Sequence, residues 1–342
     1  MKYKHGFLKV CVCTCFVVFL FALWGTNPKQ DYRSLAVSDD VKRVDKRLLN
    51  FTEFKFLLNS NACDKADTVF QNVTTVQIVT SFAGNIEARN ALRRAYSRAE
   101  LLKLGVVRVF LLAALKPRQS EVTQDDLQNE SNTYSDLVQG NFYESYRNLT
   151  YKHIMGLKYM YNLNSLINVK EKIGFELMGY IFKNKRPIRN KTNKWYTTKQ
   201  EFSESVYPKF LSGWLYVTTP RVVNKLLSIA HLAPFFWIDD LFVTGILAKK
   251  LGISHSSINE HFSYHPELFE CCIRDGVECE FSVGPNGGDH SLQISYQRHA
   301  YKCYIKQCKK LPYGRTVEQM CVAQRKPPAV GKGIPHFKVI RL

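Results

Sequence analysis

The stretch TVQIVTSFAGNIEARNALRRAYSRAELLKLGVVRVFLLA, residues 75–113, decides the fold class. Its first part, 75–81, is rich in β-branched side chains and predicts a buried strand. Alanines and leucines at helical spacing predict a helix from about residue 87 to residue 104, and residues 106–113 read as a second apolar strand. Strand, helix and strand over about 35 residues form a β-α-β unit, whose two strands pair in parallel. The sequence therefore predicts an α/β protein.

The chain beyond this unit continues the alternation of strands and helices. Residues 135–138, 175–182 and 214–219 are strand-like. Helices are predicted over 146–161, in the segment that Pro220 opens, and over 240–252. We expect a mostly parallel sheet with helices on both faces.

The amino terminus predicts a membrane anchor. An uninterrupted apolar run extends from Val10 to Trp24 and follows three lysines. The run is short for a spanning helix, but thin secretory-pathway bilayers accept short spans. A cleaved signal peptide is the alternative, but its cleavage site needs small residues, whereas this run ends in leucine and tryptophan. Basic residues ahead of the run orient the amino end toward the cytosol and the body toward the lumen.

These features predict five segments. They are a cytosolic tail (1–9), a transmembrane signal anchor (10–25), a stem (26–70), a luminal domain (71–300) and a basic, cysteine-containing extension (301–342).

Five N-x-S/T sequons agree with a luminal body. The sequon at Asn148 lies at a predicted helix start, so we expect it to stay unmodified. The four residues predicted to carry glycans are Asn50, Asn72, Asn129 and Asn190.

The cysteines predict a disulfide-stapled C-terminal region. Three of the ten lie in the anchor, and five of the other seven fall between residues 271 and 308, ahead of Cys321. Seven is an odd number, so one thiol stays free or bridges to a partner chain. His261 and His265, followed by Cys271 and Cys272, offer metal ligands instead, but an oxidising lumen favours disulfides.

The formal net charge of +19 favours anionic partners. The basic residues are scattered, with no run of five or more, and no nucleic-acid module is recognisable. Nucleic acid is therefore excluded as a partner. A solvated basic surface is the favoured interpretation, and a membrane-tethered polyanion binder is the alternative.

Five segments in order resemble one enzyme family: IVTSFAGNIEARNALRRAYS (78–97), NFYESYRNLTYKHIMGLKY (141–159), RPIRNKTNKWY (186–196), YPKFLSGWLYV (207–217) and WIDDLFVTG (237–245). The set is similar to the β-1,3-galactosyltransferases and β-1,3-N-acetylglucosaminyltransferases of glycosyltransferase family 31. The resemblance implies a nucleotide-sugar transferase (GT-A-like) fold in a type II Golgi membrane protein. It also implies a hexosyltransferase that moves a sugar from a UDP-sugar to a glycan, glycoprotein or glycolipid acceptor, by inverting β-1,3 transfer assisted by Mn²⁺.

The resemblance also implies a set of site residues. Asp240 is the candidate base that takes the proton of the acceptor hydroxyl, and Asp239 orients it or the acceptor. The helix arginines Arg89 and Arg93 could reach the diphosphate, although a solvated helix face is as good an interpretation of their spacing. Helix capping and core aromatics are the structural alternative for the acids and their neighbours. The remaining substrate-binding candidates are Trp195, Tyr207, Ser212, Gly213, Trp214 and Trp237. Trp214, Trp237 and Phe242 are expected to form an aromatic wall on which a sugar face would stack.

One part of the expected site is missing. The family places a strand ending in Asp-x-Asp after its Gly-Leu-Lys-aromatic motif, but here GLKYM (156–160) runs directly into YNLNSLINVKEK (161–172). A segment of about twenty residues is absent, roughly a core strand with its lead-in and turn. The chain could be a variant of an active enzyme, an inactive luminal protein that binds glycans or a partner transferase, or an enzyme in which another acid, with Asp136 nearest, holds the metal. Losing a central strand would also leave neighbouring strands with unpaired edges.

Overall fold

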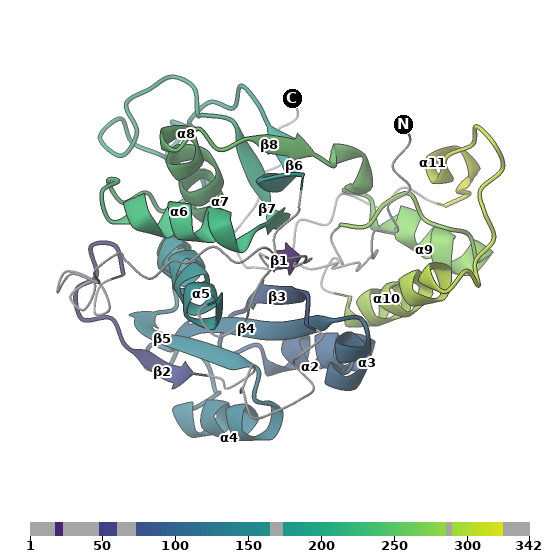
Figure 1. The fold of residues 1–342 in the computed structure, drawn as a ribbon, viewed down its shortest axis with the longest axis horizontal. Helices are drawn as coiled ribbons and strands as arrows, with labels where there is room; N and C mark the ends of the chain where they lie inside the picture. Colours follow the sequence, from purple (N-terminus) through teal and green to yellow (C-terminus); the bar gives the residue numbers. More distant parts are fainter. Residues whose placement is uncertain (1–17, 23–47, 60–72, 165–173, 285–288, 324–342) are drawn as a thin grey trace, which may run out of the picture.

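The computed structural model describes residues 18–22, 48–59, 73–164, 174–284 and 289–323. In this part of the chain a single mixed sheet has the strand order β2-β5-β4-β3-β1-β7-β6-β8 (Figure 1). Four pairs are parallel (β3–β4, β4–β5, β1–β7 and β6–β8) and three are antiparallel (β1–β3, β2–β5 and β6–β7). The predicted α/β class is confirmed, with a mixed sheet. The strands are β1 Val18–Ala22, β2 Phe56–Asn59, β3 Thr75–Thr80, β4 Val106–Ala114, β5 Leu137–Tyr143, β6 Leu177–Phe182, β7 Phe210–Thr218 and β8 His255–Ser257.

The helices between residues 86 and 104 and between residues 146 and 250 follow predicted segments, whereas four others, 124–134, 266–275, 290–304 and 317–320, were not predicted from the sequence. The helix expected over 87–104 is in fact two, because Ser97 adopts an extended backbone and forms a capping box with Glu100 that starts a new helix. The strand expected at 135–138 begins later and runs to Tyr143. The helices are α2 Ile86–Ala95, α3 Arg98–Lys103, α4 Gln124–Tyr134, α5 Leu149–Asn164, α6 Pro220–Ala230, α7 Asp239–Leu241, α8 Ala248–Lys250, α9 Pro266–Asp275, α10 His290–Tyr304 and α11 Val317–Met320, with short turns η2 Tyr146–Asn148, η3 Phe242–Leu247 (a π-helix) and η4 Asn259–His261.

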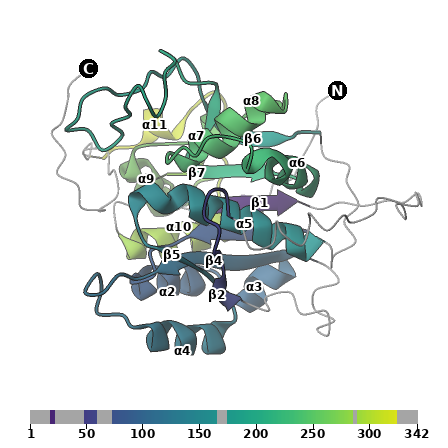
Figure 2. The ribbon, with the colours of Figure 1, turned by 90° about the vertical axis from the view of Figure 1, so that its left-hand side faces the viewer.

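Helices cover both faces of the sheet, as the alternation of side chains along β4 shows. Val109 and Leu111 are buried in one apolar cluster with residues of α5 and α6, whereas Phe110 and Leu112 are buried in another with residues of α2 and α4. Successive strand residues point to opposite faces, so β4 is apolar throughout because both faces are covered. In both views α4 and α8 lie at opposite ends of the molecule (Figures 1 and 2).

Strand β1 comes from the apolar run that the sequence predicts to be a membrane anchor. Residues 18–22 pair antiparallel with β3 and parallel with β7, in a central position of the sheet. The edges that a lost core strand would leave open are therefore paired here by β1. The other residues of the predicted tail and anchor, and most of the stem, lie outside the described residues. Within the described residues, no helix combines the length and the apolar character needed to cross a bilayer.

The C-terminal quarter carries the predicted disulfides: Cys271–Cys321, Cys272–Cys279 and Cys303–Cys308. The seventh cysteine outside the anchor, Cys63, lies outside the described residues, as does residue 324 onward. With Cys271 and Cys272 both in disulfides, the alternative metal site with His261 and His265 has lost its thiolates. Of the predicted glycosylation sites, Asn50, Asn129 and Asn190 are exposed, and Asn72 lies outside the described residues.

Candidate active site

The candidate site lies at one edge of the sheet. Strands β3, β4 and β5 are parallel, so their carboxyl ends meet at the same edge. Phe19 of β1 pairs with both Ile78 of β3 and Tyr216 of β7, in opposite directions, so the amino end of β7 reaches that same edge. The loop after β3 and the first residues of β7, which include Gly213, therefore meet where α7 begins.

Asp240 is a half-buried carboxylate that joins α7 to β7. Its Oδ2 accepts a hydrogen bond from the Gly213 backbone N–H at 2.9 Å, and its Oδ1 accepts one from the Leu241 N–H at 2.8 Å. A Cβ at Gly213 would come within 3.2 Å of Oδ2, so glycine permits this approach. The helix begins at Asp239, after Ile238, which makes no side-chain cap. Helix capping therefore explains only the local bond of Asp240 to its neighbour.

Asp239 does not act as a helix cap either, because its side chain contacts a residue that is far away in the sequence. Its Oδ2 lies 3.0 Å from Nδ1 of His153 in α5, and Nε2 of the same ring lies 2.6 Å from the Tyr216 hydroxyl on β7. His153 is 1% exposed and Tyr216 is fully buried. Both ring nitrogens are thus engaged, and Asp239 is fixed by a buried contact that spans two elements.

The two adjacent carboxylates have different electrostatic surroundings. Burial, together with the negative charge of Asp239, raises the pKa of Asp240 to about 7, against the opposing effect of its backbone hydrogen bonds. Burial lowers the pKa of His153, although contact with Asp239 acts the other way. A buried carboxyl group whose pKa is raised beside a second carboxylate is a pattern found in catalytic acids and bases. Asp240 can therefore exchange a proton near neutral pH.

An aromatic and cationic cluster surrounds these acids. The Trp237 ring lies 5.9 Å from that of Tyr146, and the Arg147 guanidinium lies 4.5 Å from the Trp237 ring centre. Trp195 is 38% exposed and donates its indole N–H to the Tyr146 hydroxyl at 2.9 Å. Burial, with the charges of the nearby acids, raises the pKa of Tyr146. Trp237 itself is buried, but the exposed rings of Tyr146 and Trp195 can stack on a sugar ring.

The other members of the predicted aromatic wall lie elsewhere. Trp214 packs against Tyr264 at 4.8 Å, on the face that carries α2 and α4, whereas Phe242 is fully buried in the cluster on the other face.

Two further substrate-binding candidates are buried. The Tyr207 hydroxyl lies 3.0 Å from that of Thr197. The remaining residue, Ser212, is buried and accepts a bond from the Trp214 N–H at 3.3 Å.

The predicted diphosphate-binding arginines are engaged with carboxylates. Arg89 is 1% exposed; it forms a two-pronged ion pair with Glu130, at 2.8 and 2.6 Å, and donates to the carbonyl oxygens of the loop after β3. Arg93 pairs with Asp136 at 2.7 Å and also reaches Glu130 at 2.8 Å. Asp136 precedes β5, at the amino end of that strand, away from the acids of α7. Both arginines therefore brace α2 against its neighbours, and Asp136 is an ion-pair partner of Arg93.

A buried Lys152–Glu144 ion pair shapes the same edge. The ammonium lies 2.8 Å from the carboxylate and also donates to the Ser81 carbonyl at 2.7 Å. Glu144 accepts the backbone N–H groups of Ala83 and Ala113 at 3.0 and 2.9 Å. The pair thus ties the ends of β3 and β4 to α5, the helix that carries His153.

The described residues do not supply the ligands of an Mn²⁺ site at this edge. Divalent manganese favours several oxygen ligands, usually carboxylates. Here Oδ2 of Asp239 contacts His153, both oxygens of Asp240 accept backbone N–H groups, and Glu144 is paired with Lys152. The one cluster of three candidate ligands among the described residues, His299 with Cys303 and Cys308, lies in the C-terminal region, and its two sulfurs are bonded to each other.

Sequence reasoning missed several residues of this cluster. His153, Tyr216 and Tyr146 were not singled out, although His153 follows the motif lysine Lys152 directly in the 141–159 segment. The only hint in the sequence was that His153 is a single histidine in a largely apolar predicted helix. Its partner Asp239 is 86 residues away, a contact that spacing does not reveal.

Comparison with known proteins points to one family. A model of the galactosyltransferase family matches residues 87–173 and 160–259, about half of the chain. The two matches overlap across Met160–Tyr161, where the resemblance predicts the missing segment. The chain is similar to β-1,3-galactosyltransferase 5 of Mus musculus, 28% identical over 230 residues (60% of this chain, 74% of the relative), and of Homo sapiens, 25% identical over 230 residues (60% and 73%). It is also 25% identical over 319 residues to β-1,3-galactosyltransferase 1 of Mus musculus (83% of this chain, 94% of the relative).

Proposed function

Because this chain belongs to the galactosyltransferase family, we propose that it transfers a hexose from a UDP-sugar to a hydroxyl of a glycan, glycoprotein or glycolipid, with inversion and a β-1,3 linkage. The observation that carries the proposal is the half-buried carboxylate of Asp240, whose pKa is raised to about 7 beside the fixed anion Asp239. A general base works best when its pKa is near the working pH, because a useful fraction of it is then ionised and it still binds a proton well.

In the proposed reaction Asp240 takes the proton as the acceptor hydroxyl attacks the anomeric carbon. Its two backbone hydrogen bonds fix the direction of the carboxylate, so the basic lone pair is aimed before the acceptor arrives. Asp239 raises the proton affinity of its neighbour, and His153 holds Asp239 in place. Tyr146 and Trp195 offer the exposed aromatic faces against which the acceptor sugar would stack, and the buried Trp237 lies beside Tyr146.

Donor binding belongs to the edge formed by the loop after β3. Arg89 holds the carbonyls of this loop, and Lys152 holds that of Ser81, so we assign both as positioning residues for the donor. The resemblance implies that Mn²⁺ would offset the charge growing on the diphosphate. Since the described residues lack its ligand set, no step is assigned to the metal here.

We further propose a Golgi protein with a luminal body. The single span of a type II membrane protein, which the sequence predicts over residues 10–25, conflicts with the pairing of Val18–Ala22 in the sheet, so the proposal does not include it. Three disulfides and exposed sequon asparagines support an oxidising, glycosylating lumen. Cys63 is the remaining cysteine that could join a partner chain.

The test is transfer itself. The purified protein is incubated with a panel of UDP-hexoses and terminal-galactose or N-acetylglucosamine acceptors, with and without Mn²⁺, and products are read by mass spectrometry. Asp240→Asn is expected to lower kcat by at least about a hundredfold while leaving UDP-sugar affinity, measured by calorimetry, within about twofold. Transfer at an unchanged rate in this variant would refute Asp240 as the base.

A second candidate function rests on the missing Asp-x-Asp. An inactive transferase fold that binds glycans or a partner transferase predicts glycan binding without UDP-sugar binding, in the presence or absence of Mn²⁺. The same calorimetry separates the two candidates.

A further inference from the structure

The three disulfides of the C-terminal region differ in their exposure. Two of them are built into an apolar cluster with Phe269 and Tyr296, and three of their four cysteines are at most 5% exposed. Cys303 and Cys308 are both half-buried, and the residues between them, 304–307, are all exposed. Among the three, Cys303–Cys308 is therefore the bond in which both cysteines are partly exposed, whereas Cys271–Cys321 exposes only Cys321.

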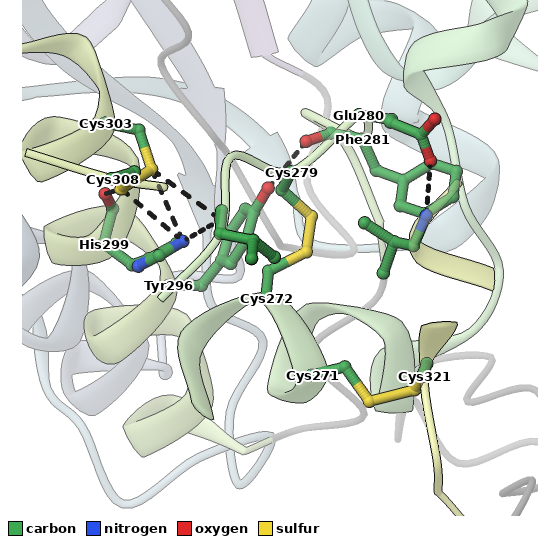
Figure 3. The surroundings of a disulfide bond; sticks show 12 residues. Cys271, Cys272, Cys279, Glu280, Phe281, Tyr296, His299, Cys303, Cys308 and Cys321 are labelled. Atoms are coloured by element: carbon green, nitrogen blue, oxygen red, sulfur yellow. Dashed lines mark hydrogen bonds between the residues drawn. A yellow bond between two sulfur atoms is a disulfide. The ribbon is translucent and has the colours of Figure 1, made fainter. Parts of the chain in front are cut away.

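A buried imidazole lies against this bond (Figure 3). Nε2 of His299 is 3.4 Å from Sγ of Cys303 and 4.0 Å from Sγ of Cys308. The same nitrogen lies 2.8 Å from the Val277 carbonyl oxygen, which can only accept, so Nε2 carries the proton. This N–H is donated to the Val277 carbonyl, and the Cys303 sulfur lies close enough that a thiolate formed there can share the same proton.

The electrostatic surroundings favour thiolate over thiol. Lys302, Lys306, Lys309 and Lys310 flank the two cysteines and are exposed, and residues 290–317 contain no aspartate or glutamate. The acids of the facing segment that lie near Lys309 are Asp275 and Glu278, so the lysines outnumber them around the bond. Positive neighbours lower the pKa of a cysteine. Cys303 lies in the last turn of α10, where the helix dipole opposes a negative charge. The imidazole N–H and the lysines oppose that effect at this position.

The turn that carries the bond is held by the backbone without it. Lys306 N–H donates to the Cys303 carbonyl at 3.0 Å and Gln307 N–H to the Lys302 carbonyl at 2.8 Å. Beyond the turn, Lys309 N–H donates to the Gly276 carbonyl at 2.9 Å. The two cysteines are only 5 residues apart in sequence, and opening a disulfide that closes so short a loop releases little chain entropy. The two sulfurs would therefore stay close after reduction, ready to rejoin.

We propose that Cys303–Cys308 is a thiol–disulfide exchange site that takes a small thiol of the glutathione type. The thiolate of the small thiol attacks Sγ of Cys308, the bond between the cysteines breaks, and its electron pair stays on Sγ of Cys303, which accepts the N–H of His299. Cys308 is then in mixed disulfide with the small thiol. A second small thiolate attacks the small-thiol sulfur of that mixed disulfide, giving the oxidised small thiol and the Cys308 thiolate, and both protein thiolates take protons from water. Two electrons pass from two small thiols to the protein, and the reverse steps restore the bond.

The experiment compares the three bonds within one molecule. The purified, oxidised full chain is placed in glutathione buffers of graded reduced-to-oxidised ratio, quenched with acid and alkylated, and each disulfide is quantified by peptide mass spectrometry. Cys303–Cys308 is expected to open at least about tenfold faster than Cys272–Cys279, through a detectable glutathione adduct on Cys308, while circular dichroism stays native.

Two kinds of variant test the cause. His299→Phe removes the N–H donor and is expected to slow opening by about threefold to tenfold, whereas His299→Gln, which keeps a donor, stays closer to the wild-type rate. Lys309→Gln with Lys310→Gln alters exposed side chains only and is expected to slow opening by roughly twofold to threefold at low salt. This second variant does not depend on the buried ring.

Three results would overturn the proposal. They are equal opening rates for the three disulfides, loss of native circular dichroism as Cys303–Cys308 opens, and an adduct found on the core cysteines instead. None of these readouts involves a sugar nucleotide, so each is independent of the transferase activity.

Discussion

Replacing Asp240 by asparagine should make the stability of this protein less dependent on pH. A carboxyl group whose pKa is raised in the folded state stabilises the fold fully below its unfolded pKa, and this contribution is lost as the pH rises through the folded pKa. For Asp240 the window runs from 3.8 to about 7. Wild-type protein should therefore lose stability from this group as the pH rises across the window, and Asp240→Asn should not.

The size of the effect follows from the shift. Raising the pKa from 3.8 to about 7 corresponds to about 4 kcal/mol, an upper bound because Asp240 is half-buried and keeps some contact with water. Between pH 5 and pH 8 the expected change is up to about 3 kcal/mol. Asparagine also loses one of the two backbone hydrogen bonds, because its amide nitrogen cannot accept, at a cost of about 1–3 kcal/mol at every pH. The variant is thus expected to be less stable than wild type at pH 5 and equal or more stable at pH 8.

Urea unfolding of both proteins at pH 5 and pH 8 measures this difference. Asp126→Asn is a matched control: this exposed acid has a pKa lowered by its hydrogen bonds to Thr123 at the start of α4. Its contribution to stability is complete above pH 3.8 and is lost only below that value, so Asp126→Asn should differ from wild type by the same amount at pH 5 and at pH 8. An equal difference between wild type and Asp240→Asn at the two pH values would refute the raised pKa and, with it, the choice of this carboxylate as a base active near neutrality.

Three other substitutions test the surrounding structure. Lys152→Met leaves the charge of Glu144 buried without its ion-pair partner, so the free energy of unfolding should fall by about 3–5 kcal/mol. Its control is Arg94→Ala, which breaks an exposed ion pair and should lower the free energy of unfolding by at most about 1 kcal/mol. Similar losses in the two variants would contradict the burial argument. Gly213→Ala pushes a methyl group against the candidate base and should lower kcat with little change in melting temperature; the reverse pattern would count against the close approach. Leu20→Pro removes a backbone donor from a central strand, and a thermal melt should show at least about 3 kcal/mol of destabilisation, whereas a segment that lies only in a membrane would leave the melt of the body unchanged.

Local pattern was enough to predict much of the architecture. The β-branched run before residue 81 and the apolar run after residue 105 became β3 and β4, since a strand buried on both faces must be apolar throughout. Cysteine density predicted the stapled C-terminal region, and the adjacent acids within an apolar run marked the candidate site. Each of these signals depends on neighbours within a few residues, which is the range over which periodicity and composition act.

The residues with which the charged side chains pair could not be predicted from local sequence patterns. Arg89 and Arg93 at helical spacing fit a phosphate-binding face equally well, and only the packing of α2 against α4 turned them toward Glu130. The run from Val10 to Trp24 predicted a membrane span, yet Val18–Ala22 pair as a strand between β3 and β7. An apolar segment is favourable in either setting, so its composition cannot choose between them.

The sequence by itself determined the α/β class, the order of most strands and helices between residues 75 and 252, and the identity of the two acids. The tertiary structure decided that Asp239 faces His153, that Asp240 faces Gly213, and that one carboxylate is fixed while the other titrates near neutrality. The physical reason is that the charge state of a buried group depends on its burial and on partners brought close by folding, here from as far as 86 residues away, and those distances are set by the packing of whole elements rather than by adjacent residues.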